Sequence, residues 1–134
     1  MTYNEIIKNL FVGDMQDAIL FREQGNANIL CVLERLPEDE PSGAQHIWML
    51  KTDSHGTYVN ADKNQLDKIA RLIDIHLNNN NKLLVHCAAG LERSPLAIVW
   101  YLHKYHNKTI EEAYNIVKER RPQVFDRRIW LETN

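Results

Sequence analysis

The sequence predicts an α/β fold with a mostly parallel central sheet flanked by helices, and two observations support this prediction. Short apolar runs typical of buried parallel strands alternate with segments whose apolar residues recur at helical spacing. One such run, residues 83 to 85, leads through a loop of small residues into an apolar stretch over residues 96 to 102. This strand, loop and helix place the loop at the carboxyl end of a strand, where such folds bind anions.

The first half of the chain predicts one short helix and two strands. Residues 15 to 24 form the helix, which ends before Gly25. Residues 28 to 33 predict a buried strand, because residues 29 to 33 are a continuous apolar run. Residues 34 to 45 contain two prolines, one glycine and four acids, and predict a loop. Residues 46 to 50 predict the next strand.

Two amphipathic segments predict the longer helices. Residues 61 to 78 form the first, with Asn60 as its cap and a run of asparagines at its end. Its buried stripe is expected to consist of Leu66, Ile69, Ala70, Ile73 and Leu77. The segment 109 to 112, Thr-Ile-Glu-Glu, is a capping box that opens a second helix, and Pro122 ends it. Residues 125 to 131 predict a final short helix.

Composition predicts one soluble domain over residues 1–134. The chain has 134 residues, of which 44% are hydrophobic and 25% charged, enough for a single core. A formal net charge of −2 argues against a nucleic-acid partner. Residues 1 to 5 lack the character of a secretory signal, and the longest apolar run is shorter than a membrane span. With only two cysteines, the chain is expected in a reducing, cytoplasmic environment, with no membrane contact.

The loop that follows the strand at residues 83 to 85 contains the residues expected to bind an anion. Residues 86 to 94 read His-Cys-Ala-Ala-Gly-Leu-Glu-Arg-Ser, and Pro95 fits the first turn of a helix. Unpaired N–H groups at a helix start and a loop of small residues can close around a phosphate-sized anion. The Arg93 guanidinium can hold two oxygens of that anion at once. The residues expected to bind the anion are Ala88, Ala89, Gly90, Leu91, Glu92 and Arg93.

Cys87 is the expected nucleophile. A helix N-terminus and a nearby cation both favour the thiolate, so Cys87 is expected to be largely ionised at neutral pH. Attack of this thiolate on phosphorus gives a cysteinyl-phosphate, which divides a hydrolysis into two easier displacements. Ser94 is placed to donate a hydrogen bond to the sulfur when it leaves, and His86 to fix the loop through its ring N–H.

The pattern His-Cys, five residues, Arg-Ser resembles the signature of the cysteine-dependent protein phosphatases, and the chain is similar to a compact dual-specificity phosphatase. The resemblance covers nearly the whole chain. Residues 7 to 14 resemble the opening segment of that fold, residues 28 to 33 its next strand, and residues 111 to 122 its closing helices. It implies the phosphatase fold and phosphoric monoester hydrolysis without metal or organic cofactor.

The mechanism also needs an acid that protonates the leaving group. Asp53 follows an apolar strand and lies about where the family has its general acid, so it is the candidate. Asp62, at the start of a predicted helix, and Asp39, in the acidic loop, are the alternatives.

Glu92 departs from the family pattern, in which a small or hydroxyl residue is common before the arginine. A carboxylate pointing into the pocket would oppose anion binding, whereas one paired with a lysine or arginine would not.

Cys31 is expected to be a packed core thiol. The chain's C-terminal arginines are expected to form a solvated face, with a place beside the pocket as the alternative: Arg120, Arg121, Arg127 and Arg128. Five histidines show no spacing that predicts a metal site: His46, His55, His76, His103 and His106.

The substrate class follows from what the loop lacks. Phosphoinositide phosphatases that resemble this family have lysines in the loop, whereas residues 88 to 92 add no positive charge. The short chain also has no room for long tyrosine-recognition insertions, which predicts a shallow cleft. The expected substrates are therefore proteins phosphorylated on tyrosine, serine or threonine. A phosphatase of RNA 5′ ends and a phosphoprotein-binding module without turnover are the alternatives, as is a sulfurtransferase or arsenate-reducing enzyme.

Overall fold

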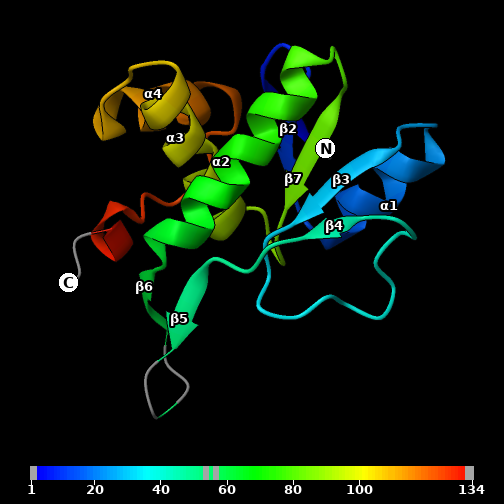
Figure 1. Cartoon of the computed structure of the whole chain (residues 1–134), viewed down its shortest axis with the longest axis horizontal. Helices are drawn as coiled ribbons and strands as arrows, with labels where there is room; N and C mark the ends of the chain where they lie inside the picture. The colour runs from blue at the N-terminus through cyan, green and yellow to red at the C-terminus, as the bar shows by residue number, and fades with distance from the viewer. Residues whose placement is uncertain (1–2, 53–54, 56–57, 132–134) are drawn as a thin grey trace.

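A five-stranded sheet organises the computed structural model, which describes residues 3–52, 55 and 58–131 (Figure 1). In spatial order its strands are β1 (Asn4–Ile7), β2 (Leu10–Gly13), β7 (Leu83–His86), β3 (Asn28–Cys31) and β4 (Gln45–His46). β7 runs parallel to β2 and β3, β4 runs parallel to β3, and β1 is antiparallel to β2. The predicted α/β class with a mostly parallel sheet is confirmed.

Helices cover both faces of this sheet. They are α1 (Met15–Glu23), α2 (Lys63–Asn78), α3 (Arg93–Tyr105) and α4 (Ile110–Arg120), followed by the 3-10 turn η1 (Arg128–Leu131). α1 lies on one face, and α2 and α3 lie on the other with α4 packed on α3 (Figure 1). Successive residues of β7 point to opposite faces of the sheet. Leu84 packs with Phe21 of α1 on one face, whereas Val85 belongs to the larger core on the other.

The prediction of one strand over residues 46 to 50 is wrong. β4 ends at His46, and the chain then leaves the sheet to form a hairpin of β5 (Leu50–Thr52) and β6 (Tyr58–Ala61). The apolar run is not one strand because Leu50 finds its partner in Ala61, outside the central sheet. Since β6 extends to Ala61, α2 begins two residues later than predicted, and its cap is Asp62 rather than Asn60.

The remaining predicted elements are found, with shifted ends. Thr109 and Glu112 form the predicted capping box of α4, which ends at Arg120, before Pro122. The predicted strand over residues 28 to 33 ends at Cys31, and the final helix is only the turn η1. None of the helices in the described ranges combines the length and apolarity needed to cross a membrane.

Candidate active site

Cys87 lies at the end of β7, facing the first turn of α3. Its sulfur is 3.2 Å from Ser94 Oγ and 3.4 Å from the Ser94 backbone nitrogen, which donates to it. Glu92, the residue before α3, makes no side-chain capping bond, so its side chain does not occupy the N–H groups of the first turn. Only 2% of Cys87 is exposed. The sulfur therefore lies at the N-terminal end of α3, beside a hydroxyl and a backbone N–H.

The shape of the loop depends on Gly90. Its φ is +69°, and a Cβ at this position would lie 2.6 Å from the carbonyl carbon of Gly13. The loop therefore packs directly on the end of β2. Met15 N also donates to Ala88 O at 3.2 Å, which ties the loop to the start of α1.

Arg121 supports the same loop from behind. Its Nε donates to Gly90 O at 2.8 Å, and its Nη1 to Asn4 Oδ1 at 2.7 Å. Only 4% of Arg121 is exposed, so the expectation of a solvated face is wrong for this residue. The alternative, a place beside the pocket, holds for Arg121, but its partners could not be predicted because they lie far away in the chain.

The predicted anion-binding residues line one continuous loop. Ala88 and Ala89 are exposed, whereas Leu91, Glu92 and Arg93 are half-buried. Leu91 O accepts from Phe125 N at 2.9 Å, which anchors the outer side of the loop to the C-terminal segment. The small, exposed residues leave the mouth of the loop open to a phosphate group.

Arg93 is oriented by an acid that the sequence did not single out. Its Nε is 3.0 Å from Glu34 Oε2, and only 16% of the Arg93 side chain is exposed. This ion pair holds the Arg93 guanidinium close to the Glu34 carboxylate at the end of the loop. Glu34 follows β3, and its only signal in the sequence is its place just after a buried strand.

Glu92 is paired rather than directed at the anion. Its Oε2 accepts from Arg127 Nε at 2.8 Å and also from Arg127 Nη2. The Arg127 guanidinium carbon is also 5.3 Å from the centre of the Trp130 ring. Of the two geometries left open by the sequence, the structure has the paired one, and Arg127 lies beside the loop.

His86 is buried directly behind Cys87. Its Nδ1 is 3.2 Å from Cys87 O, and its Nε2 is 2.7 Å from a carboxylate oxygen of Glu40. Glu40 belongs to the connection between β3 and β4 and was missed, because the contact joins residues 46 positions apart.

The general-acid candidate Asp53 lies outside the described residues. The alternative Asp62 caps α2 by accepting from Gln65 N at 3.0 Å and pairs with Lys51 at 3.4 Å. The bond from Gln65 is the main cause that lowers the Asp62 pKa, so this carboxyl is poorly suited to donate a proton. Asp39 is exposed on the connection between β3 and β4.

Cys31 is a second free thiol, and it is fully buried. Burial is the main cause that raises its pKa to about 12, with the negative charge of Glu40 adding to the effect. It is therefore a protonated core residue at neutral pH, as its apolar strand predicted.

This fold, together with a thiol and an arginine at the two ends of one loop, defines the class of cysteine-dependent phosphatases. The sequence profile of the family "Dual specificity phosphatase, catalytic domain" matches residues 10–131. The chain belongs to this family and is a phosphatase of the dual-specificity class.

The relatives differ widely in length. Protein 123R of Invertebrate iridescent virus 6, named a tyrosine phosphatase, is 30% identical over 93% of this chain and 84% of its own. The tyrosine-protein phosphatase yvh1 of Schizosaccharomyces pombe is 31% identical over 88% of this chain but 36% of its own. Human dual specificity protein phosphatase 16 is 28% identical over 89% of this chain and 18% of its own. The chain thus spans about a third or less of the last two.

Solved structures share the fold at low identity. PTPMT1, crystallised with PI(5)P, superposes with a TM-score of 0.77 at 19% identity over 98% of this chain and 91% of its own. The human tyrosine phosphatase-like serine/threonine/tyrosine-interacting protein superposes with a TM-score of 0.72 at 18% identity over 97% of this chain and 91% of its own. At these identities the likeness extends to the fold alone.

Proposed function

We propose that residues 1–134 act as one catalytic domain that removes phosphate from phosphotyrosine, phosphoserine and phosphothreonine in proteins. The observation that carries the proposal is the position of Cys87, with its sulfur against the hydroxyl and backbone N–H of Ser94 at the start of α3. An inert core cysteine needs neither partner.

In the first step, the Cys87 thiolate attacks phosphorus while the bond to the leaving oxygen breaks. The amides of residues 88 to 92 and the Arg93 guanidinium hold the other phosphoryl oxygens, which carry the charge of the transition state. Asp53 is the proposed donor of the proton that the leaving oxygen takes up.

In the second step, water attacks the cysteinyl-phosphate and releases phosphate. The sulfur leaves as a thiolate and regains its hydrogen bonds from Ser94. The loop can hold the reacting groups in place because its own backbone is held by contacts that involve Gly13, Ala88, Gly90 and Arg121.

Charge at the loop supports phosphoproteins over polyphosphorylated lipids. Arg127 neutralises Glu92, and residues 88 to 91 contribute no side-chain cation for a second phosphate. We place the enzyme in a reducing, cytoplasmic environment, since a reactive thiolate at Cys87 has to stay reduced.

The test is hydrolysis of para-nitrophenyl phosphate in the presence of EDTA, followed by matched phosphopeptides and a 5′-phosphorylated RNA. We expect vanadate-sensitive turnover that Cys87→Ser abolishes, and higher kcat/KM on the phosphopeptides than on the RNA. Binding of phosphopeptide without turnover, or a preference for the RNA, would overturn the proposal.

Asp53 has its own test. Asp53→Ala should keep phosphate binding and reduce kcat on a phenyl phosphate with a poor leaving group by about 10²-fold or more. Turnover of para-nitrophenyl phosphate, whose leaving group needs little protonation, should fall less. Turnover of both substrates unchanged from the wild type would assign the acid elsewhere, with Asp62→Ala as the next variant.

A further inference from the structure

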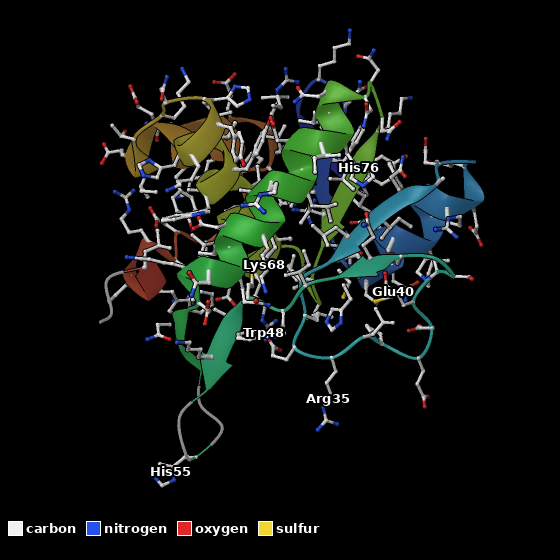
Figure 2. All side chains as sticks on the ribbon, in the orientation of Figure 1. Arg35, Glu40, Trp48, His55, Lys68 and His76 are labelled. Carbon is white, nitrogen blue, oxygen red and sulfur yellow. The ribbon has the colours of Figure 1, made fainter. Side chains whose placement is uncertain are left out.

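Three polar side chains meet behind the loop, on the side of Cys87 that faces the core. They are His86 at the end of β7, Glu40 from the connection between β3 and β4, labelled in Figure 2, and Cys31 at the end of β3. One ligand atom from each lies within 4.8 Å of the others. The His86 and Glu40 side chains are 0% and 2% exposed. Water therefore does little to screen the charge in this cluster.

Both ring nitrogens of His86 face hydrogen-bond acceptors. Nδ1 faces Cys87 O at 3.2 Å, and Nε2 faces the Glu40 carboxylate at 2.7 Å. A backbone carbonyl can only accept, and an ionised carboxylate can only accept. A neutral imidazole has one N–H and would leave one of these contacts with two lone pairs facing each other. Both contacts are satisfied when the pair holds two protons between them, and with Glu40 ionised both protons lie on the ring, which is then an imidazolium.

The geometry favours a proton over a metal ion between His86 and Glu40. Two ligands of a tetrahedral zinc ion, each about 2.0 Å from the metal, are about 3.3 Å apart. The observed separation of 2.7 Å is shorter and matches a charge-assisted hydrogen bond. The other hydrogen-bond neighbour of the Glu40 carboxylate is the Cys31 thiol, which is a weak donor, so the imidazolium is the principal compensation for this carboxylate.

We propose that Glu40 is a positioning residue for the phosphatase reaction, holding His86 as an imidazolium behind the loop with its Nδ1–H on the Cys87 carbonyl. The inference rests on the proposed function of Cys87 as nucleophile. His86 contacts Cys87 through Nδ1 while Glu40 lies on the opposite ring nitrogen, so the pair presents its positive end to Cys87 and favours the thiolate. Among the described residues, the titratable groups that act on this cluster besides His86 and Glu40 are the thiols of Cys31, which belongs to it, and of Cys87.

The primary test is the protonation state of His86, read from its ring ¹⁵N signals in nuclear magnetic resonance at pH 7.5. We expect two bound protons in the wild type and one in Glu40→Gln, which is isosteric but cannot balance an imidazolium. Glu38→Gln, an exposed position on the same connection, removes the same charge and should leave His86 doubly protonated. A neutral His86 in the wild-type protein would overturn the proposal, and this readout decides even if Glu40→Gln does not fold.

The second readout is the rate at which iodoacetamide alkylates Cys87 at pH 6.5, followed by mass spectrometry. Glu40→Gln should slow alkylation and lower kcat about threefold to tenfold, and Glu38→Gln should change neither. Glu40→Asp keeps the charge and should recover part of both rates. A Glu40→Gln rate equal to wild type, or a stoichiometric metal ion that this variant loses, would overturn the proposal. Absence of phosphatase activity in a protein whose His86 is doubly protonated would instead contradict the proposed function.

Discussion

At the scale of single residues, pairing decides whether a charge helps or harms the site. A carboxylate at position 92 opposes anion binding when it points into the loop, yet Arg127 holds Glu92 from outside through two nitrogens. Arg127 is in turn packed against an aromatic ring of η1, that of Trp130. The C-terminal segment thus neutralises the charge that Glu92 brings to the loop.

This pairing predicts an asymmetric result for two substitutions. Glu92→Ser should leave the inhibition constant for vanadate within about twofold, because the acid is already neutralised. Arg127→Ala should weaken vanadate binding about threefold to tenfold, because the released carboxylate then repels the anion. The double variant should return to the Glu92→Ser value. Weakening that persists in the double variant would show that Arg127 acts on the anion directly.

Cys31 predicts a dependence of stability on alkaline pH. Its pKa is about 12 in the folded chain and 9.0 in the reference state, so above pH 9 the unfolded chain loses a proton that the folded chain keeps. The stabilising contribution is complete below pH 9 and is lost as the pH rises toward 12. The slope for one such group is at most about 1.4 kcal/mol per pH unit.

Urea unfolding of the wild type and Cys31→Ala at pH 8, 9.5 and 10.5 measures this effect. The free energy of unfolding should fall more steeply for the wild type above pH 9, while the two slopes agree below it. Parallel curves over the whole range would mean that the Cys31 thiol ionises equally in both states.

At the scale of elements, the loop between β7 and α3 depends on one backbone conformation. Gly90 combines a φ of +69° with a Cβ position 2.6 Å from Gly13, whereas Gly25 has a φ of +93° with open space around it. Gly90→Ala should therefore abolish most activity and vanadate binding. Gly25→Ala should cost about 1–2 kcal/mol of stability and keep kcat/KM. Unfolding by urea and turnover of para-nitrophenyl phosphate separate the two costs, and an active Gly90→Ala enzyme would contradict this account of the loop.

The elements also show what one sequence can predict. The capping box of α4 and the loop from β7 to α3 were predictable because their residues interact within a few positions of each other. The division of residues 46 to 50 between β4 and β5 was not, because the partner of Leu50 lies in another segment. The same holds for Glu40 and Arg121, whose contacts at the site join distant parts of the chain. The residues of the motif can be recognised because they are close in the sequence. The residues that support them cannot, because the fold brings them in from distant segments.

At the scale of the whole molecule, the loop is held from several elements. β2 contacts it through Gly13, α1 through Met15, and the end of α4 through Arg121, which also reaches β1. An anion that binds the loop therefore binds only the folded chain. Its binding energy should appear as global stability rather than as a local ordering of the loop.

Tungstate, a tetrahedral oxyanion, tests this coupling without turnover. At a concentration 100 times its dissociation constant it should add about 2.7 kcal/mol to the free energy of unfolding, and raise Tm by about 10 °C. Arg93→Met should remove most of the shift because the guanidinium is the group proposed to hold two oxygens of the anion. Gly25→Ala should keep the full shift from its own lower Tm, since Gly25 lies at the far end of α1. Differential scanning calorimetry measures all three proteins, with Kd taken from isothermal titration. If the Arg93→Met protein shows the same shift as the wild type, the anion binds elsewhere, and the loop loses its assigned role in oxyanion binding.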